Sequence, residues 1–492
     1  MKAEYNIIQL FATKRILVIG DLIWDVYLKG TSSRLSPEAP VPVVDIHDRI
    51  EQAGGAANTA VNVRALGAEV MFLSVVGADD EGKRSRMVLS SAGIDTSALI
   101  ESANRKTIVK TRVLIGVHTQ TRFDSGTTAT VDDNLENEMI HLLRQAYASC
   151  DAVILSDYNK GVITPGILTA LKDLYRERPV SIAADSKRLL FFKDLHPAFV
   201  KPNYEEALSL VGFATQGDGR ITQIKCMGNE LFKGTGAEIT VVTLDKEGAV
   251  LFEKNNFTQH VLTPEVHSPR VAGAGDTFMA AFVLASICGG APATAANLAC
   301  ASASIAIKKE GTATCAATEL KAFFMVDEKV IRTTDALESL CDFYRLEGKR
   351  IVFTNGCFDI LHSGHVSYLN RAKRLGDILI VGVNTDESIR RLKGEKRPIN
   401  PLQDRIDVLA GLSAVDHVIP FGSESDDTPI ELIGLARPNV FVKGGDYSRD
   451  KLPEAETVEQ HGGEIVFLSL VPDHSTSNII RQIHTSTSLV TS

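Results

Sequence analysis

Short apolar runs alternate with stretches of helical period along the N-terminal region of this 492-residue chain, and this alternation constrains the fold more than any other feature. Such runs are typical of buried strands. They cover residues 15–20, 69–76, 151–156, 180–184, 198–201 and 238–243, and the first predicted helix covers residues 56–66. Because strands connected through helices pair in parallel, the sequence predicts an α/β protein with a mostly parallel sheet covered by helices.

Residues 106–121 show a different pattern, in which polar and β-branched residues alternate with period two. This period is typical of a strand with one solvated face. We therefore expect a small β-sheet beside the main sheet, where it would form a lid.

Length and composition define the broad class of protein. The chain is too long for one domain, and its 44% hydrophobic and 23% charged residues are ordinary for a globular protein. A net charge of −9 argues against nucleic-acid binding. The sequence has neither an 18-residue apolar run nor a signal-peptide pattern, which predicts a cytoplasmic protein without membrane contact. Seven cysteines without C-x-x-C spacing predict reduced thiols and no zinc site.

The strongest chemical pattern lies in the last third of the chain. An apolar strand, Arg350–Thr354, leads into the segment Asn355–His365, in which His362 and His365 flank a serine and a glycine. A strand that ends in such a turn and opens a helix points free backbone N–H groups at an anion. Two imidazoles there can donate hydrogen bonds to phosphate oxygens. The same four residues also fit a helix-capping turn without a ligand.

The segment Gly356–His365 resembles the cytidylyltransferase-like nucleotidyltransferases, in which G-x-F-D-x-x-H runs into H-x-G-H. The resemblance implies a Rossmann-like domain over residues 345–492 and nucleotidyl transfer from a nucleoside triphosphate to a phosphorylated substrate. It assigns catalysis to His362, His365 and Lys393. It assigns ATP binding to Gly356, Phe358, Ser475 and Thr476.

A second pattern, Arg270–Phe278, contains G-A-G-D and precedes a helix of small residues that ends near Cys288. Gly273 and Gly275 allow close approach of the backbone to a ligand, and the helix start supplies N–H donors for a phosphoryl group. Asp276 is placed to accept a proton from an attacking hydroxyl. A glycine turn with a capping aspartate is the alternative.

Together with Gly54–Ala60 and with N-x-x-E at Asn203–Glu206, this pattern resembles the ribokinase-like sugar kinases. The resemblance implies a kinase domain over residues 1–330 and a homodimer formed through this domain. It also implies Mg²⁺ and allows a monovalent cation such as K⁺. It makes Asp276 the catalytic base and Gly273, Ala274 and Gly275 the anion hole. It assigns ATP binding to Asn203, Glu206, Asp245 and Gly248, with Glu206 holding the metal through water. We also assign Lys187 to ATP, because it is a cation that follows a predicted strand. Many relatives have glycine at position 245.

Sugar contacts are expected where the first strand ends. Asp21 and Asp25 carry carboxylates that suit the hydroxyls of a polyol, although helix capping or a surface role would also explain them. Trp24 lies between them and could cover the sugar or simply pack. The resemblance adds Gly54, Gly55 and Asn58 to the sugar-binding residues.

A sugar kinase and a nucleotidyltransferase in one chain catalyse consecutive steps toward a nucleotide sugar. The order of the two halves resembles the bifunctional heptose enzymes of lipopolysaccharide-core synthesis. That family implies phosphorylation of heptose 7-phosphate at O1 and adenylyl transfer to heptose 1-phosphate, with ATP and sugar phosphates as ligands. Three alternatives stay open: another sugar or CTP, one half acting only as a sensor, or an assembly scaffold.

Residues 319–349 contain no chemical motif, and 336–344 have apolar residues near helical period. We expect a packed helical connector in this stretch.

Overall fold

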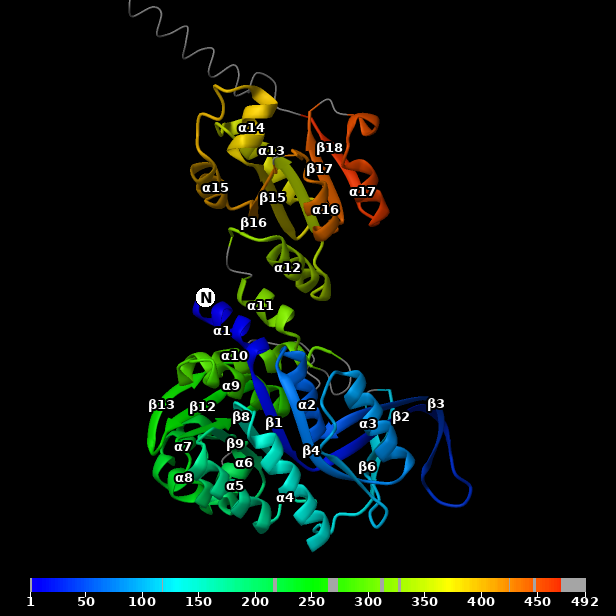
Figure 1. Cartoon of the computed structure of the whole chain (residues 1–492). Helices are drawn as coiled ribbons and strands as arrows, with labels where there is room; N and C mark the ends of the chain where they lie inside the picture. Colours follow the sequence, from blue (N-terminus) through cyan, green and yellow to red (C-terminus); the bar gives the residue numbers. More distant parts are fainter. Residues whose placement is uncertain are drawn as a thin grey trace, which may run out of the picture. The chain divides into compact units, whose positions relative to one another are not determined.

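The computed structural model describes residues 2–116, 118–215, 219–263, 273–309, 314–325, 329–423, 425–445 and 448–469. Contacts divide the chain into two compact units, Met1–Leu320 and Lys321–Ser492. Figure 1 shows each unit as a sheet with helices packed on it.

The first unit contains a nine-stranded sheet in the order β13-β12-β11-β10-β9-β8-β1-β4-β5. Pairing is parallel from β5 to β11 and antiparallel through β12 and β13, which confirms the predicted mostly parallel α/β sheet. Its strands are β1 (Arg15–Gly20), β4 (Glu69–Gly77), β5 (Leu99–Ser102), β8 (Ala152–Asp157), β9 (Ser181–Ser186), β10 (Phe199–Val200), β11 (Ile239–Thr243), β12 (Ala249–Glu253) and β13 (Asn256–Val261).

Helices connect these strands and cover the sheet, as the predicted alternation requires. They are α1 (Lys2–Leu10), α2 (Ala56–Ala65), α3 (Asp80–Ser91), α4 (Asp133–Tyr147), α5 (Pro165–Glu177), α6 (Tyr204–Val211), α7 (Arg220–Lys225), α8 (Gly228–Thr235), α9 (Ala274–Ile287) and α10 (Pro292–Ala306). Helix α9 is buried along most of its length, and its small side chains let α2 and α10 pack closely against it.

A separate four-stranded sheet, the lid sheet, has the order β3-β2-β6-β7. Its strands are β2 (Leu22–Leu35), β3 (Pro42–Gly55), β6 (Ile108–Ile115) and β7 (His118–Ser125). The predicted flanking sheet therefore exists, but the sequence indicated only its β6–β7 half. Strand β2 begins two residues after the end of β1, and β3 runs directly into α2.

The second unit contains a five-stranded, entirely parallel sheet in the order β16-β15-β14-β17-β18. Its strands are β14 (Ile351–Gly356), β15 (Ile378–Asn384), β16 (His417–Phe421), β17 (Val440–Gly444) and β18 (Glu464–Leu468). Its helices are α13 (Ser363–Lys373), α14 (Asp386–Lys393), α15 (Leu402–Ala410), α16 (Ile430–Ala436) and α17 (Ala455–Gln460). This is the predicted Rossmann-like arrangement.

The second unit begins earlier than the predicted domain start at residue 345. Helix α12 (Thr334–Leu346) packs on α16, and Tyr344 Oη lies 2.7 Å from His417 Nε2. The Arg345 guanidinium donates to the Ala436 carbonyl at 2.7 Å. The connector is thus a packed helix whose contacts lie with the nucleotidyltransferase-like sheet.

Each sheet reverses its strand order at one place, between β1 and β8 in the first unit and between β14 and β17 in the second. Ligands of open α/β sheets bind at the carboxyl ends of the strands beside such a reversal. The two segments singled out after strands β1 and β14 begin there. No helix among the described residues is both long enough and apolar enough to span a bilayer.

Gly55, at the start of α2, has φ +59°, and a Cβ added to it would lie 2.4 Å from the Asp21 carbonyl oxygen. We expect Gly55→Ala to lower the free energy of unfolding of the first unit by about 2–4 kcal/mol, since left-handed strain and a backbone clash add. Gly212→Ala is the control, because Gly212 has φ +76° with nothing within 4 Å. Denaturant unfolding measures the free energy of unfolding of both variants, and equal losses would show that the predicted clash at Gly55 has no effect.

Candidate functional site

The candidate kinase centre is built around Asp276, in the first turn of α9. This carboxylate is 7% exposed and accepts hydrogen bonds from Asn58 Nδ2 at 2.7 Å and Thr59 Oγ1 at 2.9 Å. The Tyr158 hydroxyl lies 3.3 Å from the same carboxylate. Asn58 and Thr59 belong to α2 and Tyr158 follows β8, so two segments far from α9 in the sequence hold this acidic side chain.

A buried chain of hydrogen bonds fixes the orientation of Asn58. Thr277 Oγ1 donates to Asn62 Oδ1 at 2.7 Å, and Asn62 Nδ2 donates to Asn58 Oδ1 at 3.2 Å. The Asn58 amide is therefore occupied on both sides, and its side chain is 2% exposed. One N–H of the Asn58 amide thus holds Asp276, and the contact of Asn58 with sugar stays a prediction.

Burial raises the pKa of Asp276 to about 6. The Asn58 hydrogen bond opposes this rise, nearby Asp185 adds to it, and Thr59 and Lys201 oppose it. Above pH 6 the carboxylate is mostly ionised and can accept a proton from a hydroxyl. A base with a pKa close to the working pH suits general-base chemistry.

The start of α9 has the geometry of an anion site. Gly273 is its N-cap with φ +88°, and the backbone continues through Ala274 and Gly275 into the helix. Lys201 is 5% exposed and pairs with Asp185 at 2.9 Å. A Cβ on Gly275 would lie 3.2 Å from Lys201 Nζ, so this ammonium group adds charge beside the N–H groups.

Lys201 is a site residue that the sequence reasoning passed over. Burial lowers the pKa of this lysine, but the adjacent Asp185 carboxylate outweighs burial and raises the pKa overall, so that the group stays charged. The sequence feature that could have identified Lys201 is its position at the end of a strand, two residues before Asn203.

Asn203 and Glu206 form a capping box at the start of α6. Asn203 Oδ1 accepts from the Glu206 N–H at 2.8 Å, and Glu206 Oε2 accepts from the Asn203 N–H at 3.0 Å. Burial raises the pKa of Glu206. Lys187, which follows β9, is exposed.

Asp245 occupies the left-handed region with φ +54°, where glycine is favoured. Its carboxylate pairs with Arg220 at 3.1 Å. Gly248 has φ +88°, and a Cβ there would lie 1.9 Å from the Val261 carbonyl oxygen. The aspartate at position 245 fits this turn, because aspartate tolerates the left-handed conformation better than most residues.

Asp21 has a structural role in this fold, and its contact with sugar stays a prediction. It is 0% exposed, and its carboxylate accepts from the backbone N–H groups of Tyr158, Lys160 and Val162 at 2.9, 3.0 and 3.1 Å. These bonds saturate the carboxylate and hold the loop after β8 in place. That loop carries Tyr158 to the kinase centre.

Asp25 lies on the lid sheet and pairs with Arg112 at 2.6 Å. A Cβ on Gly54 would lie 2.0 Å from Asp25 Oδ2, so the glycine makes room for this carboxylate. Trp24 is 2% exposed, which favours packing over the open stacking surface that a sugar needs.

The candidate nucleotidyltransferase centre lies where β14 ends and α13 begins. His362 is the N-cap residue of α13, and the rings of His362 and His365 stack with centroids 3.9 Å apart. Phe358 lies 5.4 Å from the His365 ring and has φ +44°. A Cβ on Gly356 would lie 3.2 Å from the Phe358 ring, so this turn is closely packed.

Burial, followed by the nearby His362 and Lys393, lowers the pKa of His365 to about 4. This places Lys393, at the end of α14, in electrostatic contact with the histidine pair. Ser475 and Thr476 lie outside the described residues.

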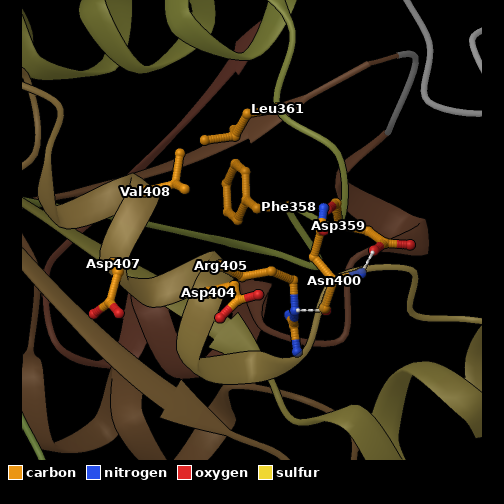
Figure 2. Close-up of a pocket in the computed structure, with 8 residues that line it drawn as sticks. All are labelled: Phe358, Asp359, Leu361, Asn400, Asp404, Arg405, Asp407 and Val408. Atoms are coloured by element: carbon orange, nitrogen blue, oxygen red, sulfur yellow. Dashed lines mark hydrogen bonds between the residues drawn. The ribbon is translucent and has the colours of Figure 1, made fainter.

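Buried ion pairs keep the loop before α13 in shape. Asp359 is 3% exposed, pairs with Arg397 and accepts from the N–H groups of Ile399 and Asn400 at 2.7 and 3.0 Å. Arg405 donates to the Cys357 carbonyl at 2.7 Å. Figure 2 shows Asp359 and Arg405 among the side chains that line a cavity beside this loop. The cavity has a volume of about 400 Å³. Its lining residues are Phe358, Asp359, Leu361, Asn400, Asp404, Arg405, Asp407 and Val408.

The folds and the two sites define a carbohydrate kinase joined to a nucleotidyltransferase. Residues 13–319 match the pfkB family of carbohydrate kinases, and residues 353–482 match the cytidylyltransferase-like family. The chain is 38% identical to the bifunctional protein HldE of Geobacter metallireducens over 97% of this chain and 98% of that protein. It is 37% identical to the bifunctional protein HldE of Helicobacter hepaticus over 96% of this chain and 97% of that protein. The chain belongs to the HldE family of bifunctional enzymes.

Solved structures agree on the fold of the first unit. Arabidopsis thaliana ribokinase, complexed with ribose and ATP, superposes with a TM-score of 0.51 and 19% identity over 63% of this chain and 98% of that one. Phosphofructokinase-2 from Escherichia coli, in complex with potassium, superposes with a TM-score of 0.52 and 18% identity over 63% of this chain and 98% of that one.

We expect kinase kcat/KM to fall as the pH drops below about 6, because Asp276 becomes protonated. Thr59→Val should shift this acidic limb upward by about one pH unit, since the ionised carboxylate loses a hydrogen bond. pH–rate profiles of the wild type and of Thr59→Val test this expectation. A shift between the two profiles reports titration of Asp276, because the substrate titrates at the same pH with both proteins. Adenylyl transfer by the same chain is the control, and an unshifted limb would contradict the role of Thr59.

The His365 imidazole should titrate near pH 4 in the ligand-free protein. Lys393→Met should raise this pKa, because a neighbouring cation disfavours the imidazolium. Heteronuclear NMR of labelled histidines measures both values. Lys396→Met serves as the control, and an unchanged His365 pKa in Lys393→Met would separate Lys393 from this site.

Proposed function

We propose that this chain makes ADP-heptose in two ATP-dependent steps. The N-terminal half phosphorylates O1 of D-glycero-β-D-manno-heptose 7-phosphate to the 1,7-bisphosphate. After a separate phosphatase removes the 7-phosphate, the C-terminal half transfers AMP from ATP to heptose 1-phosphate and releases pyrophosphate. The product supplies lipopolysaccharide-core synthesis in the cytoplasm. The observation that carries the proposal is one chain with a held aspartate at the start of α9 and a histidine pair at the start of α13.

In the kinase step, Asp276 accepts the proton from the sugar O1 hydroxyl as this oxygen attacks the γ-phosphorus of ATP. The backbone N–H groups of Gly273, Ala274 and Gly275 and the Lys201 ammonium face the charge that builds on the transferred phosphoryl group. ADP leaves and the proton stays on the carboxylate until release. The hydrogen bonds from Asn58 and Thr59 keep the base in one orientation.

In the second step the nucleophile is already an anion, so positioning and charge neutralisation suffice. An oxygen of the sugar 1-phosphate attacks the α-phosphorus of ATP, and pyrophosphate leaves. His362, His365 and Lys393 donate to the triphosphate oxygens, while Gly356 and Phe358 shape the turn that receives it. We assign Ser475 and Thr476 to the same nucleotide.

The remaining assignments concern the kinase ligands. For ATP we propose Lys187, Asn203, Glu206, Asp245 and Gly248. For the sugar we propose Asp21, Asp25, Gly54, Gly55 and Asn58. The described residues contain no group of three or more histidine, cysteine or acidic side chains that could hold a metal ion. We propose that Mg²⁺ is held chiefly by triphosphate oxygens and water, with Glu206 bound through water. When bound, Mg²⁺ neutralises phosphate charge, and a monovalent cation such as K⁺ would act near the Asp276 loop.

We also propose a homodimer formed through the kinase half. Large apolar side chains are exposed on the lid sheet and its β2–β3 connection: Leu35, Val41, Ile46 and Phe123 are 65%, 52%, 44% and 54% exposed. Exposed apolar groups that gather on one element are typical of an interface.

The proposal is tested by ADP and pyrophosphate release with MgATP. We expect ADP with heptose 7-phosphate and pyrophosphate with heptose 1-phosphate, while fructose 6-phosphate and ribose should be poor substrates. Turnover of another sugar, with none of either heptose, would discard the pathway.

Asp276→Asn should lower kinase turnover by about 10²–10⁴-fold and spare adenylyl transfer, and His365→Ala should do the reverse. Each activity is the control for the other. Comparable loss of both activities in either folded variant would overturn the two-site assignment.

A further inference from the structure

One face of the lid sheet carries a row of charged residues. Strand register places Asp25 beside Lys110, and Lys110 opposite Asp124. In the next row Arg112 lies directly opposite Arg122. Residues two apart on a strand share a face, so all of these side chains lie on the same side of the sheet.

This charged face is turned toward the kinase centre. Lys110 Nζ lies 5.3 Å from the centroid of the Tyr158 ring, and the Tyr158 hydroxyl lies 3.3 Å from Asp276. A lysine in the lid therefore stands one aromatic side chain away from the catalytic base.

The carboxylates on this face are already paired with arginines. Arg112 binds Asp25 at 2.6 Å, and Arg122 binds Asp124 through two hydrogen bonds. Among the residues that the structure describes, Lys110 has no ion pair, although it is partly buried and burial lowers its pKa. Two arginines opposite each other in register also repel. This repulsion favours an additional anion beside the row, since Asp25 and Asp124 each pair with only one of the arginines.

Lys160, in the loop that Asp21 holds, adds a further positive charge near Asp124. Four cations then stand against two carboxylates, and two positive charges are left over. A phosphate monoester carries nearly two negative charges at neutral pH. The charge of the lid face thus complements one such group.

We propose that Lys110, with Arg112 and Lys160, binds the phosphate monoester that the sugar substrate carries before it is phosphorylated. The inference rests on the proposed kinase function and assigns the residues that select a sugar phosphate over a free sugar. The lid sheet emerges at the end of β1, whereas the residues assigned to ATP follow β9, β10 and β11 on the other side of β8. The phosphates of ATP are therefore the less suitable occupant.

Lys110→Met in the full chain removes the charge and keeps most of the side-chain volume. We expect KM for heptose 7-phosphate to rise about tenfold to a hundredfold, the usual worth of a charged hydrogen bond, with kcat and KM for ATP within about threefold of wild type. Lys83→Met, on the exposed surface of α3, is the control and should change neither KM. Thermal unfolding verifies that both variants are folded.

A comparison of heptose 7-phosphate with heptose that lacks the phosphate tests whether Lys110 binds the phosphate. Heptose without the 7-phosphate should be a poor substrate, and Lys110→Met should weaken its use no further. If the variant loses equal affinity for both sugars, Lys110 has only a packing role. If KM for ATP rises instead, the lid binds a nucleotide phosphate. Either result overturns the proposal.

A wild-type chain that ignores heptose 7-phosphate would refute the proposed function separately. The lid assignment is then measured on fructose 6-phosphate against fructose, by competition or binding. Loss of preference for the phosphorylated sugar in Lys110→Met would still support the lid subsite, and an unchanged preference would overturn it.

Discussion

The hydrogen bond between Asn58 and Asp276 joins side chains 218 residues apart, and the first active centre depends on it. It ties the helix that follows the lid to the helix that carries the base. Since Thr277 and Asn62 complete a buried chain behind it, the contact has one orientation only. Buried polar groups that are fully bonded in this way favour a single arrangement of the core.

The two halves use the same physical device. Each half has a mostly or entirely parallel sheet whose strand order reverses at one place. Each half also carries its candidate site residues at the start of a helix beside that reversal. The first half holds Asp276 in this way, and the second half holds His365. Burial shifts both groups toward the uncharged form, raising one pKa and lowering the other.

Local patterns allowed much of this to be predicted from sequence. The parallel sheets, the lid half at β6–β7 and the helices after G-A-G-D and H-x-G-H follow from short-range periodicity and turn residues. The hydrogen bonds of Asp21 and Asn58 could not be predicted from local patterns, because their partners Tyr158 and Asp276 lie 137 and 218 residues away. An unpaired carboxylate and a saturated one look identical in a sequence, and only the fold distinguishes them.

The packing of α12 has a consequence for how such a two-part gene can be divided or joined. Val330 bridges to Val418, and Tyr344 meets the buried His417 imidazole, so the connector completes the nucleotidyltransferase core. A division at residue 345 would leave that histidine facing water. A transferable C-terminal cassette must instead begin before Lys329, and recombination upstream of that point would move the second catalytic half intact.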